Sequence, residues 1–449
     1  ARDFTWERVE AVLDAIAVHL LSKGETGVVV GSDTRFLSPE MAADAAGRLA
    51  SAGFKAILAD RPTPTPVLSH AVRSLGLGGV VNFTASHNPF SYNGIKFSPS
   101  HGGPAGSDVT SSIEALIESG ARPEQCSGGS VEQKNLIDPY IEALGAFFDR
   151  KCIGGSALRV VYDPFNGTGA GLLDGILRSS GAAVRTIHEA RNPLFDGRHP
   201  EPNENGMRDV SREVVRSRAG LGLATDGDAD RFGITDENGV FVSPHDYLAL
   251  LLCHLVEKRG GRGRVVRSVS TGTLLDRAAR ELGMDVVETP VGFKYLGAEM
   301  LEGGVLLAGE ESGGLSVGGH VPEKDGILAC LLAAEIVASS GRGLSALLEE
   351  LWARFGRLFH RRLDIALTEE TRRRVSSALL EAVPPELGGA RVASTDNKDG
   401  RRFMLEGGGW VLVRLSGTEP LARIYLEAPC ERMLSSLEEH LRDLLERGV

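Results

Sequence analysis

Short apolar runs that end in polar, glycine-rich loops recur along the whole chain. They read TGVVVGSDTR, GGVVNFTASHN, LRVVYDPFNGTGAG, AGLGLATDGDAD, GRVVRSVSTGT, GGVLLAGEESGG and GWVLVRLSGTEP, with helical patterns such as GILACLLAAEIVAS and LEEHLRDLLERG between them. Strands that alternate with helices are typical of largely parallel or mixed sheets covered by helices. Ligands of such sheets bind at the carboxyl ends of the strands, which is where these loops lie. The pattern therefore predicts an α/β protein with its functional loops at strand ends.

The length of the chain and its breaks predict several domains. A chain of 449 residues is expected to hold about three or four domains of ordinary size. A first helix is expected from Val9 to Leu20, with Thr5 as its N-cap and Lys23-Gly24 at its end. The polar loop GARPEQCSGGS precedes the helical segment IDPYIEALGAFFD and indicates a first boundary. We expect domains at residues 1–140, 141–250, 251–368 and 369–449.

Composition and charge limit the class of function. The formal net charge of −11 argues against nucleic acid or an anionic membrane as the partner, although a local basic pocket can still hold a small anion. The five cysteines are scattered and form no CxxC pair, so neither a disulfide framework nor a zinc site is expected. The richest apolar stretch, YLALLLCHLV, is too short to span a bilayer, and no signal peptide is visible. These features favour a cytoplasmic protein that acts on a small molecule.

The segment TDGDADRFG carries the sharpest chemical signal. Asp226, Asp228 and Asp230 alternate on one short loop, where three carboxylates repel one another unless a cation offsets their charge. A calcium EF-hand is excluded because Arg231 stands where that loop needs glycine and because a strand, not a helix, is expected before it. Oxygen ligands with open positions suit Mg²⁺ shared with a phosphate. Taken alone, the segment is also compatible with a solvated acidic turn.

Two further loops suit a sugar phosphate. The segment RLSGTEPLAR offers guanidinium, hydroxyl and backbone N–H groups to a phosphate dianion through Arg414, Ser416, Gly417, Thr418 and Arg423. The segment LAGEESGG offers the paired carboxylates of Glu310 and Glu311, and Ser312, to sugar hydroxyls. Each loop alone also fits an ordinary turn.

The glycine-rich segment DPFNGTGAG resembles a dinucleotide site only superficially. The sixth position of the dinucleotide fingerprint is occupied by Leu172 instead of glycine or alanine. A nicotinamide or flavin enzyme is therefore not expected.

The segment VNFTASHNPFSYNGIKFS places Ser86 beside His87 in a turn-forming run. Adjacency in sequence says little about geometry in space, so this segment alone allows either a nucleophile or a polar loop. The four loops together, in this order, resemble the α-D-phosphohexomutase family of phosphoglucomutases and phosphomannomutases, most of all the bacterial phosphoglucomutases. TASHNP resembles the phosphoserine loop, DGDADR the metal loop, GEESGG the sugar loop and RLSGTEPLAR the phosphate loop.

The resemblance implies a four-domain fold: three related mixed α/β sheet domains and a smaller C-terminal α+β domain around a central cleft. It implies reversible phosphoryl transfer between O1 and O6 of a hexose phosphate, with a monomer or a homodimer as the active form. Ser86 would carry the phosphoryl group, and glucose 1,6-bisphosphate would be the intermediate and activator. Mg²⁺ would be the cofactor, held by Asp226, Asp228, Asp230 and Ser86.

The resemblance also assigns roles to single side chains. Arg231 and Arg35 would add positive charge at the reacting group, and His87 would assist there. Lys96 would be the general base, with a pKa lowered by cationic neighbours. The substrate contacts would be Glu310, Ser312, Lys324, Lys294, Arg414, Ser416, Gly417, Thr418 and Arg423.

Two departures from the family pattern bear on function. Family members begin with a glycine-rich loop that carries an active-site Arg, and this chain opens at ARDFTWERVE, just after that place. The sugar loop has the Glu-Glu-Ser-Gly form of phosphoglucomutases, whereas dual-specificity members often carry Met at the position of Glu311 and glucosamine-phosphate members often carry Gln. Glucose 1-phosphate is the expected substrate, with mannose 1-phosphate the alternative. A metal-dependent phosphatase and an inactive sugar-phosphate-binding protein are the rival classes.

Overall fold

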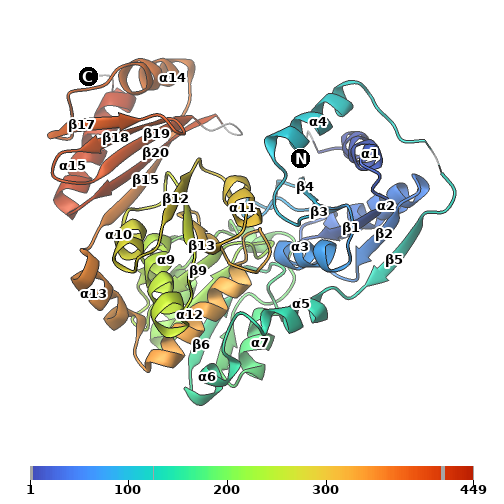
Figure 1. Cartoon of the computed structure of the whole chain (residues 1–449), viewed down its shortest axis with the longest axis horizontal. Helices are drawn as coiled ribbons and strands as arrows, with labels where there is room; N and C mark the ends of the chain where they lie inside the picture. The colour runs from blue at the N-terminus through green and yellow to red at the C-terminus, as the bar shows by residue number, and fades with distance from the viewer. Residues whose placement is uncertain (1–3, 125, 416–419, 448–449) are drawn as a thin grey trace.

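Four sheets follow one another along the chain and define four domains (Figure 1). The computed structural model describes residues 4–124, 126–415 and 420–447. Three mixed α/β domains are followed by an antiparallel sheet with helices on it, which confirms the predicted fold class. The residue limits predicted between the domains stay predictions.

Domains 1 to 3 repeat one strand order. In each, the first strand pairs in parallel with the second and the third, and a fourth strand runs antiparallel to the third. The sheet orders are β4-β3-β1-β2-β5, β10-β9-β8-β6-β7 and β12-β11-β13-β14. The first and third strands are neighbours whose connections leave in opposite directions, and such a switch point is where ligands bind in α/β sheets.

The first domain contains α1 (Trp6–Ser22), β1 (Gly27–Ser32), α2 (Ser38–Ser51), β2 (Lys55–Ala59), α3 (Thr65–Ser74), β3 (Gly79–Phe83), β4 (Ile95–Pro99), α4 (Ser107–Glu118) and β5 (Ser130–Lys134). The short helices α5 (Ile137–Leu144) and α6 (Arg150–Gly155) lead to the second domain. The second domain contains β6 (Arg159–Asp163), α7 (Leu173–Ser179), β7 (Ala183–Thr186), η1 (Phe195–Gly197), α8 (Arg208–Ser217), β8 (Leu221–Thr225), β9 (Phe232–Thr235) and β10 (Phe241–Val242).

The third domain contains α9 (Pro244–Cys253), η2 (His254–Lys258), β11 (Arg264–Ser268), α10 (Leu274–Glu281), β12 (Val286–Thr289), α11 (Phe293–Leu301), β13 (Val305–Glu310), β14 (Gly314–Val317), α12 (Gly326–Ser340) and α13 (Leu344–Phe355). The fourth contains β15 (Phe359–Ala366), α14 (Glu369–Val375), η3 (Ser376–Glu381), β16 (Glu386–Leu387), β17 (Ala390–Asp396), β18 (Arg401–Leu405), β19 (Trp410–Leu415), β20 (Leu421–Ala428), α15 (Glu431–Arg442) and η4 (Asp443–Arg447).

The elements expected from the sequence are present. Each predicted apolar run forms a strand that ends at its polar loop, and α1 begins behind Thr5, whose side chain accepts a hydrogen bond from the backbone N–H of Arg8. The strand β5 was not expected, because SVEQK is polar and largely exposed. It forms the edge of the sheet and pairs in parallel with β2, so backbone hydrogen bonds and not apolar burial place it there.

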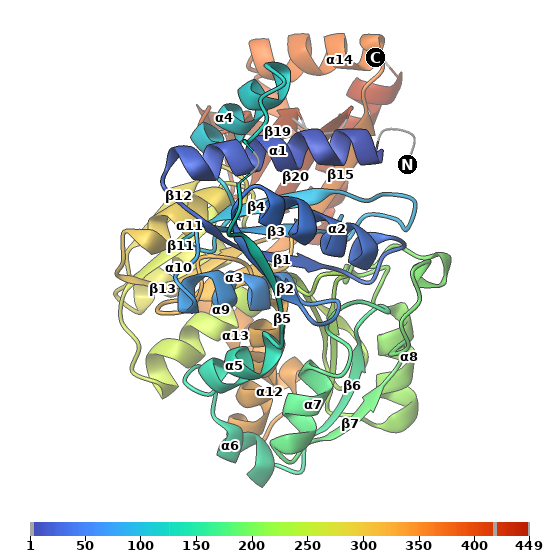
Figure 2. The ribbon, with the colours of Figure 1, turned by 90° about the vertical axis from the view of Figure 1, so that its right-hand side faces the viewer.

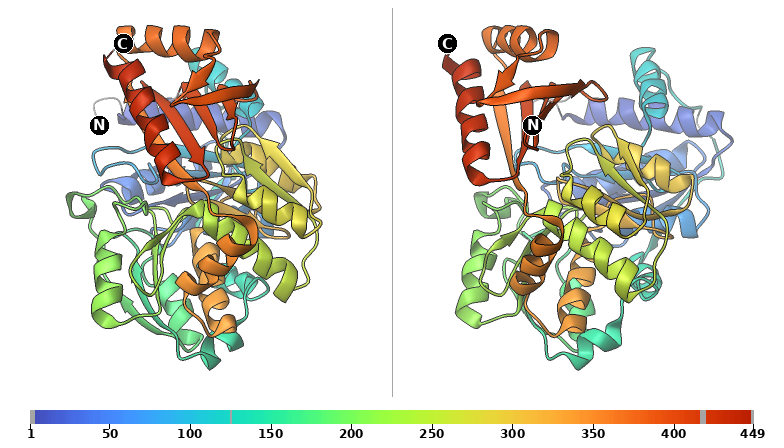
Figure 3. Two further views of the ribbon diagram at one scale, coloured as in Figure 1. Left: turned by 90° about the vertical axis from the view of Figure 1, so that its left-hand side faces the viewer. Right: turned by 60° about the vertical axis from the view of Figure 1, so that its left-hand side comes forward.

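One apolar core runs through domains 1 to 3, whose ribbons Figures 2 and 3 show from other sides. Its centre is α12, which is buried from Gly326 to Val337 and packs on β8 and β9 of domain 2 and on β14 of domain 3. Domain 4 has a separate core between its sheet and the helices α14 and α15. Domains 1 to 3 therefore share buried surface that domain 4 lacks.

Among the described helices none is by itself long and apolar enough to cross a membrane, although α12 and α13, bent by 88° at their junction, pass that test as a pair.

Domain 4 meets domain 3 through a charged contact. Glu288 on β12 accepts hydrogen bonds from Arg267 of domain 3, at 2.7 Å, and from both terminal nitrogens of Arg402 on β18, at 2.5 and 2.9 Å. Burial would raise the pKa of Glu288, but Arg402 and Arg267 outweigh burial and lower it to about 2. A small apolar cluster of Val269, Trp410 and neighbouring residues lies beside this contact. The Glu288 carboxylate is thus one of the groups that join domain 4 to domain 3.

We predict that Glu288→Ala lowers the free energy of unfolding by about 2 kcal/mol, because two largely buried guanidiniums lose their shared partner. The control Glu431→Ala, which removes an exposed partner of Arg361, should cost about 0.5 kcal/mol or less. Because the folded pKa of Glu288 is depressed, this stabilisation is complete above pH 4.5 and is lost as the pH falls towards 2. Thermal unfolding at pH 7 and pH 3 measures both effects, and equal losses for the two variants would contradict the prediction.

Candidate active site

The three predicted catalytic and sugar loops occupy the same place in the repeated topology. Each connects the third strand of its domain to the antiparallel fourth: Ser86 lies between β3 and β4, and Asp226 to Asp230 lie between β8 and β9. Glu310 ends β13, and Glu311 and Ser312 lie between β13 and β14. Backbone contacts join the loops, since Phe232 N–H donates to the carbonyl of Gly313 at 2.9 Å and Gly326 N–H donates to that of Ala229 at 3.1 Å. The repeat therefore brings distant sequence segments to one site.

Ser86 lies directly against the acidic loop. Its hydroxyl donates to Oδ2 of Asp226 at 2.8 Å, across 140 residues of sequence, and the residue is buried. Its φ of 50° is in the left-handed region, which is uncommon for a residue other than glycine. The opposing residue is Gly227, where a Cβ atom would lie 2.7 Å from the carbonyl oxygen of Ser86. Only glycine lets the two loops approach this closely.

The aspartates of the acidic loop suit a hard divalent cation. Asp226, Asp228 and Asp230 are fully buried, and each offers one carboxylate oxygen within 4.8 Å of the others. Oδ1 of Asp228 and Oδ1 of Asp230 are buried and have no hydrogen-bond partner among the described residues. Burial and the neighbouring carboxylates Asp230 and Asp228 raise the pKa of Asp226 well above its ordinary value. An all-oxygen set of this kind fits Mg²⁺, which would relieve both the repulsion and the unpaired oxygens.

Two lysines contact the outer oxygens of the same carboxylates. Lys96 Nζ lies 2.6 Å from Oδ2 of Asp228 and 3.0 Å from Oδ2 of Asp230, and Lys324 Nζ lies 2.9 Å from the latter atom. Burial would lower the pKa of Lys96, but Asp228, Asp230 and Glu323 outweigh burial and raise it above the ordinary value. The expectation that cationic neighbours lower this pKa was therefore wrong, because the nearest charges are carboxylates.

Arg231 and His87 flank the acidic loop. The guanidinium of Arg231 lies 3.7 Å from Glu201 and 3.9 Å from Asp230, and its Nε is buried without a hydrogen-bond partner among the described residues. Burial and Arg231 lower the pKa of His87 to about 2. His87 is therefore neutral at physiological pH, so any assistance from it is by hydrogen bonding and not by positive charge.

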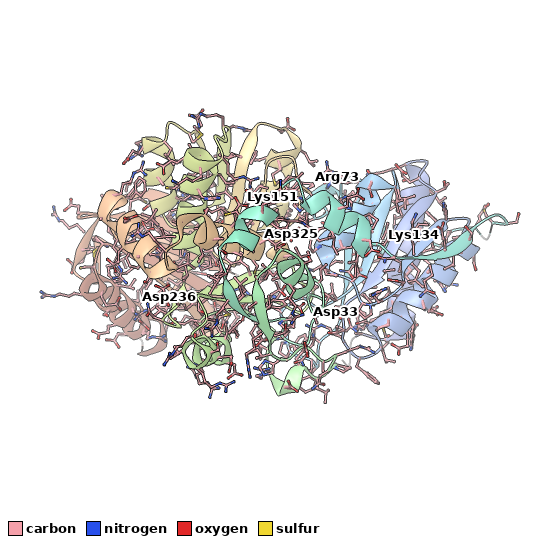
Figure 4. The ribbon with its side chains drawn as sticks, turned by 90° about the horizontal axis from the view of Figure 1, so that it is seen from below. Asp33, Arg73, Lys134, Lys151, Asp236 and Asp325 are labelled. Atoms are coloured by element: carbon pink, nitrogen blue, oxygen red, sulfur yellow. The ribbon has the colours of Figure 1, made fainter. Side chains whose placement is uncertain are left out.

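Arg35 does not face the reacting group as expected. Its side chain is buried, and its hydrogen bonds go to Asp33 and to backbone carbonyls of the segment from Ser86 to Tyr92. Its N–H groups are directed at the serine loop itself, so its positive charge lies beside Ser86 without a contact to the serine hydroxyl, and the predicted effect of this charge on the reacting group stays a prediction. Figure 4 shows Asp33, its carboxylate partner, on domain 1 beside the loops of domain 2.

The sugar loop borders a cavity of about 510 Å³ between domains 2, 3 and 4. Ser312 and Glu311 line the cavity together with Glu201, Arg362 and Tyr425. Glu310 is buried and accepts a hydrogen bond from Gly292 N–H at 2.8 Å, and burial raises its pKa. Glu311 accepts from the Ser270 hydroxyl, and burial raises its pKa as well, against the opposing charge of Arg362. Hydrogen bonds to Glu310 and to Glu311 thus fix the position of the sugar loop.

The phosphate loop is described in part. Ser416, Gly417 and Thr418 lie outside the described residues, whereas Arg414 and Arg423 are paired across β19 and β20. Arg414 Nη2 lies 2.9 Å from Oδ2 of Asp399, which also accepts a hydrogen bond from Val291 N–H of domain 3 at 2.8 Å. The carboxylate of Asp399 therefore pairs with one nitrogen of the Arg414 guanidinium, which was predicted to bind phosphate.

Lys294, the weaker predicted contact, bridges two domains. It lies on α11 of domain 3 and donates to the Ser107 hydroxyl of domain 1 at 3.0 Å. Its ammonium group also lies 5.0 Å from the centre of the Tyr295 ring. Lys294 therefore reaches across to domain 1 and does not point into the sugar loop.

Several residues of the site were not predicted. Glu323 is buried beside Lys324, and burial raises its pKa to about 7. Thr65 donates to Oδ2 of Asp228 at 2.6 Å, and its backbone N–H donates to the carbonyl of Asp228 at 2.9 Å. The glycine-rich segment DPFNGTGAG supports the acidic loop, since Thr168 N–H donates to the carbonyl of Gly227 at 3.0 Å. Of these residues, only Glu323 could have been suspected from the sequence, because it adjoins the predicted contact Lys324.

Comparison with known proteins agrees with this arrangement. Four family models described as phosphoglucomutase/phosphomannomutase match the chain: alpha/beta/alpha domain I at residues 1–124, domain II at 138–239, domain III at 243–355 and the C-terminal domain at 370–444.

Individual proteins match over nearly the whole length. A phosphoglucomutase/phosphomannomutase of Thermococcus kodakarensis is 34% identical over 94% of this chain and 89% of its own. A protein of Methanopyrus kandleri assigned as a phosphoglucosamine mutase is 32% identical over 94% and 90%. A crystal structure of a protein of Thermus thermophilus assigned as a phosphomannomutase superposes with a TM-score of 0.88 and 38% identity, over 99% of this chain and 96% of that one.

We predict that Asp228→Asn weakens Mg²⁺ binding at least about tenfold, because the cation loses one of three charged ligands. Titration calorimetry of the purified protein with MgCl₂ measures the affinity. Asp236→Asn is the matched control, since Asp236 is also a buried aspartate of domain 2 but accepts only the backbone N–H groups of its own turn. Equal Mg²⁺ affinity in the parent and Asp228→Asn would contradict the metal assignment.

We also predict that Asp399→Asn strengthens binding of inorganic phosphate by roughly fivefold, because a solvent-accessible ion pair such as the half-buried Arg414–Asp399 pair is worth up to about 1 kcal/mol. The asparagine oxygen keeps the hydrogen bond from Val291 N–H while the charge that competes for Arg414 is removed. Competition of phosphate for the substrate site reports the change, and Glu386→Gln, which removes an exposed charge of the same domain, controls for net charge. Weaker phosphate binding in Asp399→Asn would show that Asp399 orients Arg414 for phosphate.

Proposed function

Since the chain belongs to the phosphoglucomutase/phosphomannomutase family of phosphohexomutases, which are isomerases, we propose that it interconverts glucose 1-phosphate and glucose 6-phosphate. The observation that carries the proposal is the Ser86 hydroxyl, 2.8 Å from Asp226 at the edge of three buried carboxylates. A nucleophilic oxygen beside a cation site is the arrangement that phosphoryl transfer needs.

The proposed reaction consists of two phosphoryl transfers. Phospho-Ser86 donates its phosphoryl group to the free hydroxyl of the hexose monophosphate, which gives a bisphosphorylated sugar and the free serine hydroxyl. The sugar turns round, and Ser86 then attacks the other phosphate and releases the isomeric monophosphate. The enzyme ends phosphorylated as it began, and glucose 1,6-bisphosphate is therefore both the intermediate and an activator of enzyme that has lost its phosphoryl group.

The carboxylates are proposed to bind the cation, and the cationic side chains to stabilise the phosphoryl group. Asp226, Asp228 and Asp230 would hold Mg²⁺, with Ser86 as the fourth ligand, and bound Mg²⁺ supplies Lewis acid character at the phosphoryl oxygens. Lys324 and Arg231 bring positive charge to the same place. Asp226, whose Oδ2 lies 2.8 Å from the Ser86 hydroxyl oxygen, is proposed to accept the serine proton when the serine attacks.

Lys96 is proposed to exchange a proton with the sugar hydroxyl. The base of one transfer is the acid of the other, because the second transfer is the reverse of the first in type. The protonated form that Asp228 and Asp230 favour suits the step in which a sugar oxygen leaves. His87, neutral beside Ser86, would donate or accept a hydrogen bond at the same group.

The substrate contacts divide between two loops. Glu310 and Ser312 are proposed to bind the sugar hydroxyls, with Lys324 as a further contact. Arg414 and Arg423, with Ser416, Gly417 and Thr418, are proposed to bind the phosphate that does not react. A few fixed hydrogen bonds suit a sugar that binds in two orientations.

Glucose specificity rests on the sugar loop. Its Glu-Glu-Ser-Gly form is that of phosphoglucomutases. A phosphomannomutase or a dual-specificity enzyme is the second candidate, since the relative from Thermococcus kodakarensis carries both names. A single sugar contact gives only a few kcal/mol of discrimination at most, so the two candidates are close.

A phosphorus NMR time course tests the reaction and the specificity together. The protein is mixed with Mg²⁺, a trace of glucose 1,6-bisphosphate, and equal glucose 1-phosphate and mannose 1-phosphate. We expect the glucose signal to move to a 6-phosphate resonance with mannose lagging. Equal rates would make the enzyme dual in specificity. Growth of inorganic phosphate alone would indicate a phosphatase, and binding without any conversion an inactive sugar-phosphate-binding protein.

We predict that Ser86→Ala lowers kcat at least about a thousandfold, as loss of a nucleophile does, while the affinity for glucose 1-phosphate stays within about threefold. Ser91→Ala, at an exposed serine of the same loop, should keep the parent rate. The coupled production of glucose 6-phosphate gives the rates, and titration calorimetry gives the affinities. Activity of Ser86→Ala near that of the parent would remove the nucleophile assignment.

A further inference from the structure

We propose that Asp33, Arg35 and Thr84 form a clamp that fixes the backbone of the catalytic loop and so aims the Ser86 hydroxyl at the acidic loop. The proposal rests on the proposed function, since it takes Ser86 as the residue that carries the phosphoryl group. We call these three residues the serine clamp. Arg35 is a positioning residue in it, and it has no part in binding phosphate.

Every N–H of the Arg35 guanidinium is used within the protein. Nε donates to Oδ2 of Asp33 at 2.9 Å. Nη1 donates to the carbonyls of Pro89 and Tyr92 at 2.8 and 3.1 Å, and Nη2 donates to those of Ser86 and Asn88 at 2.6 and 2.7 Å. A guanidinium has five N–H groups, so none is left for a phosphate oxygen. The four carbonyls belong to one turn, which closes around the guanidinium.

A second chain of hydrogen bonds reaches Ser86 from the other side. Oδ2 of Asp33 also accepts from the Thr84 hydroxyl at 2.8 Å, and the Thr84 oxygen accepts from the backbone N–H of Ser86 at 2.9 Å. Oδ1 of Asp33 accepts from the backbone N–H of Arg35 at 3.0 Å. Both the N–H and the carbonyl of Ser86 are therefore tied to one carboxylate–guanidinium pair.

The backbone of Ser86 needs such support. Its φ of 50° is a strained conformation for a residue with a Cβ atom, and it persists only where the surroundings determine it. The residues of the serine clamp are all buried, Asp33 at 0%, Arg35 at 1% and Thr84 at 2% exposure. Water therefore does not compete for these hydrogen bonds, which makes them both stronger and harder to replace.

Domain 2 covers the serine clamp. The ring of Phe195 lies 4.9 Å from the guanidinium carbon of Arg35. Gly227 of the acidic loop packs against the Ser86 carbonyl that Arg35 holds. The orientation of Ser86 is thus set between Arg35 on one side and the acidic loop on the other, and the 2.8 Å contact from its hydroxyl to Asp226 is the result.

The geometry demands arginine at this position. A lysine ammonium has only three N–H groups and no planar fork, so it cannot hold four carbonyls and Asp33 together. Thr84 likewise needs its hydroxyl, which donates and accepts at once. These requirements make the serine clamp testable with conservative substitutions that keep charge or shape.

The experiment compares Arg35→Lys, Thr84→Val and Thr84→Ser with the parent. Arg48→Lys is the control, because Arg48 is also an arginine of domain 1 with two hydrogen bonds to one carboxylate, that of Asp14. We measure kcat and KM for glucose 1-phosphate, Mg²⁺ affinity by calorimetry, and hydrogen exchange of the amides from residue 84 to residue 92.

We expect Arg35→Lys to lower kcat by roughly a hundredfold, as a displacement of about 1 Å at a reacting group does, with KM and Mg²⁺ affinity within about threefold of the parent. Thr84→Val should lower kcat in the same way, whereas Thr84→Ser, which keeps the hydroxyl, should keep the kcat of the parent. Exchange from residue 84 to residue 92 should accelerate in Arg35→Lys and Thr84→Val but not in Arg48→Lys. Guanidinium added to Arg35→Ala should recover part of kcat, and methylammonium should not.

Other results would overturn the serine clamp. A large rise in KM with kcat unchanged in Arg35→Lys would make Arg35 a phosphate ligand. Parent activity in both Arg35→Lys and Thr84→Val would show that neither residue positions Ser86. If the parent itself converts no hexose phosphate, the proposed function fails, and the hydrogen-exchange comparison still decides whether Arg35 and Thr84 hold the loop. Should Arg35→Lys not fold, Thr84→Val against Thr84→Ser gives the same decision.

Discussion

The rest of the site depends on how three buried carboxylates are kept side by side. Asp226, Asp228 and Asp230 repel one another, and burial raises the cost of their charge. Lys96 and Lys324 offset part of that charge at the outer oxygens, while Oδ1 of Asp228 and of Asp230 keeps no partner among the described residues. The protein thus maintains a negative site whose charge is only partly offset, and a divalent cation with a phosphoryl group can bind there.

The repeated topology explains how such a site is built from distant segments. In each of domains 1 to 3 the loop after the third strand carries the chemistry, and the loop after the first strand supports it. Arg35 supports the Ser86 loop, Thr168 supports the acidic loop, and Ser270 supports Glu311 of the sugar loop. Domain 4 differs, because it has its own core and meets domain 3 through polar contacts, such as those of Glu288 and Glu427, and a small apolar cluster. Arg414, the proposed phosphate contact, therefore belongs to the domain that has its own separate core.

Much of this could be predicted from the sequence, because apolar runs ending in polar loops fix both the strands and the edge where the loops meet. The acidic loop stood out by its three carboxylates, whereas Ser86 and the sugar loop were assigned by the resemblance of the four loops to the family. The roles of Arg35 and Lys96 were not predictable in this way, since they depend on which atoms face them in space: backbone carbonyls for Arg35, and carboxylates 132 and 134 residues away for Lys96. The polar strand β5 was missed because its order comes from backbone pairing with β2. Charge signs on neighbouring residues in sequence are a poor guide to a folded pKa.

The most direct test of the account is the mass of the peptide that contains Ser86. The protein is first incubated with glucose 1,6-bisphosphate and Mg²⁺, and then with excess glucose 1-phosphate carrying oxygen-18 in its phosphate. Our account predicts one phosphoryl group on Ser86 after the first step and exchange of that group for labelled phosphate during turnover in the second. Turnover with no phosphoryl group on Ser86, or with the label on another residue, would contradict it.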